Sequence, residues 1–132
     1  QNAQYAAALE RGRASAETIP DVLDAVLSIV QPIVQCNRAQ IENGRTYLRE
    51  MVFGDPEEPH HGEALAIAAQ TEEAITAVLR RDKRVGEADA ATLARVVSSV
   101  MFLSMAASLN VAWSVEEIVQ DIRKQVSALL AR

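Results

Sequence analysis

The sequence predicts an all-α fold of five to six helices, and three observations support this prediction. Alanine is abundant, while the 132 residues contain only 5 glycines and 4 prolines, a composition that favours helices over strands. Apolar residues recur every three or four positions along most of the chain, which is the spacing of one helical face. No segment alternates between apolar and polar residues over the length of a strand.

Length and charge restrict the classes of protein to which the chain can belong. A chain of 132 residues predicts one domain, large enough to bury a core without disulfides. The net charge of -5 argues against direct nucleic-acid binding, because contacts to phosphate need clustered lysine and arginine. The single cysteine, Cys36, excludes an intramolecular disulfide and fits a reducing cytoplasm. We expect a cytoplasmic protein, also because the first residues lack the basic start and apolar core of a signal peptide.

Two helices are expected in the first third of the chain. Residues 1–13 carry apolar side chains at helical spacing and predict a short connecting helix, while residues 14–18 are expected to form a polar break. Thr18 would then cap a second helix with one apolar stripe. Because proline disrupts helical hydrogen bonding, we expect this second helix to kink and to break between Pro32 and Gly44.

The middle of the chain predicts two further helices. The first carries apolar residues from Ile41 to Val52, and Gly54 is expected to close it as a left-handed cap. The sequence Asp-Pro-Glu-Glu at residues 55–58 is typical of a helix start. Residues 64–84 then predict a long helix with one apolar face, which Gly86 is expected to stop.

The stretch from Ala91 to Trp113 is apolar on nearly every side of its helical wheel, with Asp89 as the expected cap. Such a helix must be covered on both flanks, and a second copy of the same chain is the expected outer cover. A membrane span is the alternative, because the stretch is about long enough. Arg95, Asn110, four serines and the lack of flanking aromatic belts argue against it.

The last predicted helix has a complete start signal. Ser114 is the expected cap, Glu117 stands at the capping-box position, and Trp113 and Ile118 are placed to form a hydrophobic staple. A broad apolar stripe follows, opposite a charged face, which predicts a helix that packs on a core.

Motifs that carry chemistry are sparse. Two overlapping Glu-x-x-His motifs at residues 57–61 match the spacing of di-metal helix bundles, but that architecture needs the motif on separate helices. No glycine-rich phosphate loop, nucleophile elbow or Cys–His pairing is present. Cys36 is expected to be a packed thiol, and the cations at residues 80–84 to favour a helix C-terminus rather than to bind phosphate. We therefore predict no catalytic residue, no metal site and no cofactor.

Two polar residues fall on apolar stripes, Asn37 on that of the second helix and Thr71 on that of the fourth. A buried polar group is costly unless it is paired, so each has either an internal hydrogen bond or water, or a place in a ligand pocket. Soft side chains that would wall such a pocket are Met51, Phe102, Met105 and Trp113.

The order of features in residues 18–132 resembles the C-terminal domain of TetR-type bacterial transcriptional regulators. These features are the segment LREMVFGDPEE, a long helix ending in RRDKRVGEADA, the all-apolar helix and the capped last helix. The resemblance implies that residues 1–17 form the helix that connects to an N-terminal helix-turn-helix domain, which we expect upstream of Gln1. Residues 18–132 would form the effector-binding and dimerisation domain.

The resemblance also implies a homodimer, in which the last two helices of each subunit form a four-helix bundle. The expected interface residues are Val97, Met101, Val115, Ile118, Val119, Ile122, Val126 and Leu129. A pocket for a small, largely apolar effector would lie among the middle helices, at Asn37, Tyr47, Met51, Thr71, Phe102 and Met105. Effector binding would shift the connecting helix and change the spacing of two DNA-reading domains, on which the recognition of half-sites depends.

The expected function is therefore effector sensing and dimerisation in a TetR-like repressor, with DNA contacted only through the absent N-terminal domain. One alternative is a helical bundle that pairs with itself or another protein and has no ligand. A second alternative is a metal-dependent enzyme built around His60 and His61. A filled interior would favour the first alternative, and bound metal in the purified chain would favour the second.

Overall fold

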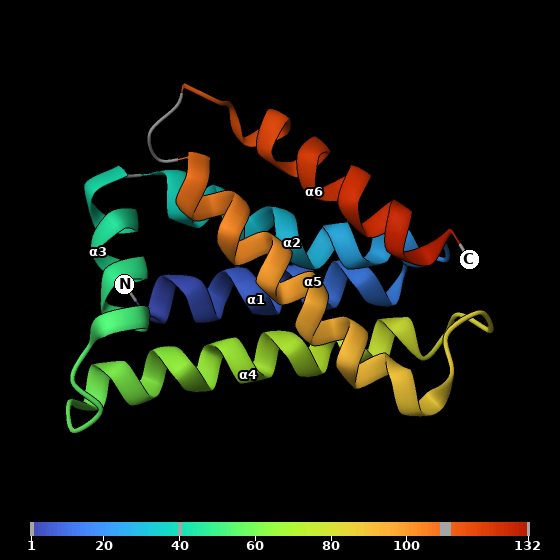
Figure 1. Cartoon of the computed structure of the whole chain (residues 1–132), viewed down its shortest axis with the longest axis horizontal. Helices are drawn as coiled ribbons and strands as arrows, with labels where there is room; N and C mark the ends of the chain where they lie inside the picture. The colour runs from blue at the N-terminus through green and yellow to red at the C-terminus, as the bar shows by residue number, and fades with distance from the viewer. Residues whose placement is uncertain (1, 40, 109–111, 132) are drawn as a thin grey trace.

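Six α-helices make up the part of the chain that a computed structural model describes, namely residues 2–39, 41–108 and 112–131 (Figure 1), and this part contains no strand. The all-α prediction is confirmed, at the upper end of the expected number of helices. The helices are α1 (Asn2–Glu17), α2 (Val22–Ala39), α3 (Ile41–Phe53), α4 (Pro59–Leu79), α5 (Glu87–Ser108) and α6 (Val115–Leu130).

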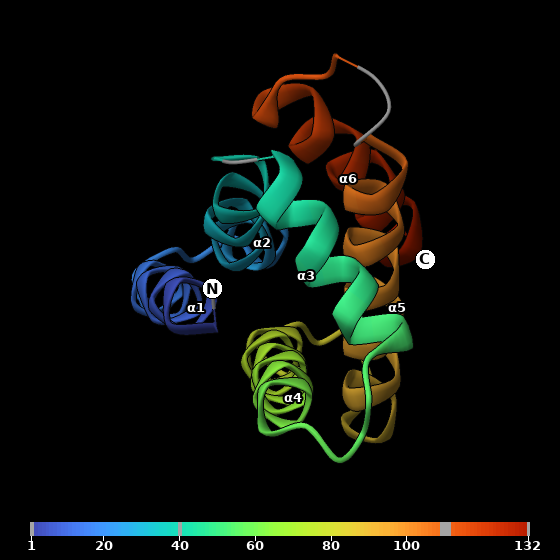
Figure 2. The ribbon, with the colours of Figure 1, turned by 90° about the vertical axis from the view of Figure 1, so that its left-hand side faces the viewer.

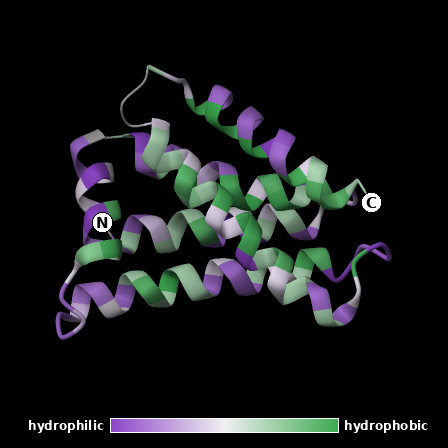
Figure 3. Ribbon diagram, viewed as in Figure 1, coloured by the Kyte–Doolittle hydropathy of each residue, from purple (hydrophilic) through white to green (hydrophobic). Residues whose placement is uncertain are grey.

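Helix α2 lies at the centre of the bundle, because it contacts each of the other five helices. Its apolar stripe is buried on several sides, with Val26, Val30 and Val34 fully covered. Helix α1 packs along α2, α5 packs on α4 and α6, and α3 lies across one end of the bundle (Figure 2). Figure 3 shows hydrophobic residues on the edge of α6 that faces the bundle and hydrophilic residues on its outer edge. Burial of these faces provides the main stabilisation of the fold.

Helix α1 is longer than the residues 1–13 that helical spacing predicts, and it ends at the same residue as the range 1–17 that the resemblance implies. Helix α1 continues without a break to Glu17, because Ala16 is buried in the core, where further helical turns bury more surface. Gly12 allows α1 to approach α2 closely, since a Cβ at this position would lie 2.7 Å from the Cα of Ile29. The cap of α2 is Asp21 rather than Thr18, because the Asp21 carboxylate accepts a hydrogen bond of 2.9 Å from the Asp24 N–H.

Helix α2 passes through Pro32 and ends at Ala39, so the break falls within the expected interval. Helix α3 ends at Phe53, but Gly54 is not a left-handed cap, since none of the described residues has a positive φ. The Gly54 N–H instead donates to the carbonyl oxygen of Glu50 at 2.8 Å, which continues the helical pattern.

Helices α4 and α5 begin and end at other residues than predicted. The Asp55 carboxylate accepts from the Glu57 N–H at 2.9 Å and forms a local turn, so α4 begins only at Pro59. It ends at Leu79, because the buried Asp82 carboxylate accepts from the Arg84 N–H at 2.9 Å and holds the chain in a turn. Helix α5 starts early enough to place Asp89 in its first turn rather than at its cap.

The junction between α5 and α6 is fastened from α2. The Arg38 guanidinium donates to the carbonyl oxygens of Ser108 and Trp113, each at 2.8 Å. It thereby supplies a hydrogen-bond donor to the last carbonyl of α5, which has no partner within the helix. The predicted capping box of α6 is confirmed, with the Ser114 hydroxyl and the Glu117 carboxylate each accepting the other residue's N–H at 3.1 Å. The end of the apolar stretch, residues 109–111 with Asn110, lies outside the described residues.

Candidate ligand cavity

A cavity lies among the middle helices, as the sequence predicts for a pocket, and α1 contributes to it as well. Five of the six predicted pocket residues line it, the exception being Asn37. The free volume is about 50 Å³, whereas pockets that hold drug-sized ligands have roughly 300–1,000 Å³. The cavity therefore offers little more than water-sized free space. Its lining residues are Tyr5, Ile33, Tyr47, Leu48, Met51, Ile67, Ala68, Thr71, Ser98, Met101, Phe102 and Met105.

The walls of this cavity are apolar and adaptable. Three of them are methionines, whose unbranched side chains change shape at low cost and contact aromatic rings favourably. Met51 and Phe102 are only half-buried, so they can turn towards solvent without displacing a helix. The cavity can therefore expand for a larger molecule through side-chain motion. Trp113, the remaining predicted wall residue, is 39% exposed and is not part of the lining.

The two polar residues that the sequence placed on apolar stripes differ in how they are paired. The Thr71 hydroxyl donates to the carbonyl oxygen of Ile67 at 2.8 Å, so Thr71 has an internal hydrogen bond and also lines the cavity. Asn37 is 0% exposed, and its Nδ2 donates to the Tyr5 hydroxyl at 3.0 Å. Its Oδ1 is buried without a hydrogen-bond partner.

An aromatic pair forms the end of the cavity at which α1, α2 and α3 meet. The rings of Tyr5 and Tyr47 are stacked, with centroids 3.8 Å apart and an angle of 14° between the planes. Burial raises the pKa of Tyr47 to about 12 and also raises the pKa of Tyr5, so both phenols are neutral at physiological pH. The apolar spacing of residues 1–13 predicts a helix that contains Tyr5, but not that Tyr5 lines the cavity. Its position as the one aromatic residue on the apolar stripe of that helix was the available signal.

The predicted interface residues lie mostly inside the single chain. Six of the eight are buried within it, and Val115 and Leu129 are half-buried. The six are covered by the chain's own helices, namely Val97, Met101, Ile118, Val119, Ile122 and Val126. The outward face of α5 carries different apolar residues, among which Leu103 is 69% and Val96 is 37% exposed. By length and composition alone, α5 could also cross a membrane.

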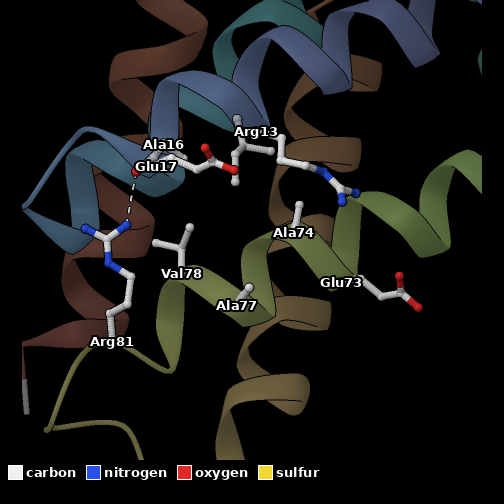
Figure 4. Close-up of a pocket in the computed structure, with 9 residues that line it drawn as sticks. Arg13, Ala16, Glu17, Glu73, Ala74, Ala77, Val78 and Arg81 are labelled. Carbon is white, nitrogen blue, oxygen red and sulfur yellow. Dashed lines mark hydrogen bonds between the residues drawn. The ribbon is translucent and has the colours of Figure 1, made fainter.

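A larger and more open groove of about 690 Å³ lies between α1 and α4 (Figure 4). Arg81, in the turn that follows α4, is directed to the end of α1, where its guanidinium donates to the carbonyl oxygens of Ala16, Ile19 and Pro20. Arg13, on the same groove, lies 3.7 Å from the Glu10 carboxylate. Because the Arg81 guanidinium already binds backbone carbonyls, we interpret this groove as a contact that joins α1 to the end of α4, and the smaller apolar cavity as the candidate site.

The other candidate groups are dispersed. Within the described residues, no three side chains of the metal-ligating types come together. His60 lies 3.9 Å from the Glu63 carboxylate, and the His61 Nδ1 lies 2.8 Å from the carbonyl oxygen of Glu50. Burial raises the pKa of the Cys36 thiol, which disfavours the reactive thiolate. In the predicted cation cluster, Arg84 pairs with Asp82 at 2.7 Å.

Comparison with protein-family models, with curated proteins and with solved structures finds no match to this chain. Function is therefore inferred from the cavity, from the contacts of α1 and from the exposed face of α5.

Proposed function

We propose that this chain is the effector-sensing and dimerisation domain of a TetR-like repressor. It binds a small, largely apolar ligand and transmits binding to a DNA-reading domain that precedes α1. The observation that carries the proposal is the position of Tyr5, which lies on the connecting helix and lines the cavity directly. A ligand that enlarges the cavity at its Tyr5 end displaces Tyr5, and with it α1.

Helix α1 makes polar contacts at three points along its length, and one of them, at Tyr5, lies against the cavity. Asn2 donates to the carbonyl oxygen of His60 and to the Glu63 carboxylate, each at 3.2 Å. Tyr5 is bonded to Asn37 near the cavity, and Arg81 binds the far end of α1. A ligand that favours another arrangement of these contacts shifts the population of α1 positions in proportion to its differential affinity.

The outward face of α5 supports dimerisation with a second copy of the chain. Arg95 is the one charged residue between Leu93 and Ser108, and it lies 3.6 Å from the Glu72 carboxylate. The exposed residues around Val96 and Leu103 are mostly small, which permits close approach of a partner helix. Figure 2 shows α5 running along one edge of the bundle. We propose that this face, rather than the buried residues named from the sequence, forms the dimer contact.

The same proposal places the protein in the cytoplasm, not in a membrane. The inner face of α5 packs along α4 and α6, and the outer face of α6 carries charged residues. A helix in such surroundings is a core helix with one uncovered side, and a partner protein covers that side at lower cost than lipid would, given the charge on Arg95.

A cavity-blocking variant tests ligand binding. Ala68 is half-buried and lines the cavity, so Ala68→Phe is expected to fill it. Compounds that raise the melting temperature of the wild-type chain in a screen of small apolar molecules should lose this effect in the variant. Ala66→Phe, on the exposed side of the same helix, is the control and should retain it.

The cavity's small volume favours one alternative, a self-pairing helical module without a ligand. That alternative predicts no stabilising compound in the screen. Equal stabilisation of the wild-type chain and Ala68→Phe would also contradict binding in this cavity.

A further inference from the structure

The groove between α1 and α4 holds two oppositely charged side chains that the fold leaves without hydrogen bonds. Arg13 and Glu17 both line this groove of about 690 Å³. The Arg13 guanidinium makes only an ion pair with Glu10, at 3.7 Å, and its buried Nε has no hydrogen-bond partner. Glu17 is exposed, and it makes no hydrogen bond or ion pair with the described residues. A cation and an anion are therefore both available to a molecule in the groove.

Arg13 and Glu17 lie one helical turn apart on α1, so one small molecule can contact both. Side chains four positions apart on a helix have Cβ atoms about 5–6 Å from each other. Although this spacing permits an ion pair, none joins Arg13 to Glu17 among the described residues. Figure 4 shows the Arg13 side chain extended from α1 towards α4, across the groove.

The other residues of the groove leave these two groups available. Arg81 is bound to backbone carbonyls at the end of α1. Glu73 is exposed, and Figure 4 shows its carboxylate directed away from the other residues drawn. The rest of the lining is apolar and consists of Ala16, Ile29, Ala74, Ala77 and Val78. The groove thus combines an available cation, an available anion and an apolar surface.

We infer that this groove binds an α-amino acid with an apolar side chain. The α-carboxylate accepts hydrogen bonds from the Arg13 guanidinium, and the α-ammonium donates to the Glu17 carboxylate. The apolar side chain packs on Ala74, Ala77 and Val78. A zwitterion fits better than a simple anion, which Glu17 would repel, or a simple cation, which Arg13 would repel.

The size and the place of the groove agree with a separate site. Its volume of about 690 Å³ lies within the range of pockets that hold small molecules, roughly 300–1,000 Å³. It shares no lining residue with the cavity among the middle helices. The inference therefore goes beyond the proposed function and does not depend on it.

Phenylalanine and two analogues that each lack one charge test this inference. Isothermal titration calorimetry would compare the Kd of the wild-type chain for phenylalanine, phenethylamine and hydrocinnamate. Phenylalanine should bind about tenfold more tightly than either analogue, because each analogue leaves one protein charge unpaired. Arg13→Gln should remove the advantage over phenethylamine, and Glu17→Gln should remove the advantage over hydrocinnamate. Arg11→Gln, at an exposed position outside the groove, should change neither.

Two further variants separate the groove from the cavity. Ala77→Phe narrows the groove, leaves both charges in place and should weaken the binding of phenylalanine. Ala68→Phe fills the cavity and should leave this binding unchanged, so a failure here is distinct from a failure of the proposed sensing function. Equal affinity of the wild-type chain for phenylalanine and either analogue would overturn the inference, as would preferences that survive in both Arg13→Gln and Glu17→Gln. No binding of phenylalanine at millimolar concentration would overturn it as well.

Discussion

Asn37 and Tyr5 form a buried polar pair whose two members lie 32 positions apart in the chain. The sequence shows that Asn37 interrupts an apolar stripe, and from this a buried amide is predictable. It does not show which side chain the amide meets, because that depends on how closely α1 approaches α2 at Gly12. The partner of Thr71 is easier to predict, because its hydroxyl donates a hydrogen bond to a carbonyl of its own helix four positions earlier.

A double-mutant cycle on this pair measures its effect on stability. Tyr5→Phe should lower the free energy of unfolding by about 1 kcal/mol or more, because it leaves the Asn37 Nδ2 without an acceptor. Tyr5→Phe combined with Asn37→Leu removes both polar partners and should be close to neutral. Urea denaturation of the four proteins checks this. A double variant less stable than the sum of the single changes would contradict it.

The tyrosine pair also predicts a dependence on high pH. Burial raises the pKa of Tyr47 from 10.0 to about 12, so the folded state holds the phenolic proton more tightly than the unfolded state. The stability that the neutral tyrosine contributes is therefore complete below pH 10 and is lost as the pH rises to about 12. Ultraviolet absorbance titration follows this directly, because Tyr5 and Tyr47 are the chain's two tyrosines. Ionisation near pH 10 with the helices intact would exclude the buried pair.

At the scale of the helices, local signals predicted some ends and missed others. The capping box of α6 is local, because Ser114 and Glu117 lie one turn apart, and it is confirmed. The end of α4 depends on the pairing of Asp82 with Arg84, which holds the chain in a turn. No helix-stop signal in the sequence predicts this turn. Arg81 acts over a longer range, since it joins the turn after α4 to carbonyls more than 60 positions earlier. Such ends are set by specific side-chain hydrogen bonds and not by helix propensity.

Arg81 should therefore matter more for stability than its neighbour in sequence. Arg81→Met removes charge-assisted hydrogen bonds to the end of α1 and should lower the free energy of unfolding by about 1–2 kcal/mol. Arg80→Met breaks only an exposed ion pair with Glu87, at 3.7 Å, and should change stability by less than about 0.5 kcal/mol. Chemical denaturation of both variants provides the comparison. Equal effects would show that Arg81 does not fasten α1.

At the scale of the whole molecule, composition and periodicity were sufficient for the fold class, whereas the place of a pocket among the middle helices was implied by the family resemblance. Five of the six residues named for that pocket line the cavity, and Asn37 does not. The orientation of α5 could not be predicted from the sequence. A helix that is apolar all round has no polar face to indicate which side is buried. Packing against α4 and α6 turns Val97 and Met101 inwards and leaves Leu103 exposed.

The central claim is that a second copy of the chain covers the outward face of α5, and sedimentation analysis tests it most directly. The wild-type chain at micromolar concentration should sediment as a dimer of the 14.3 kDa subunit. Leu103→Glu should yield a folded monomer with unchanged helix content, because it places a charge in the proposed contact. Leu65→Glu, at an exposed position on α4, should remain dimeric. A monomeric wild-type chain, or a dimer that Leu103→Glu leaves intact, would contradict the account.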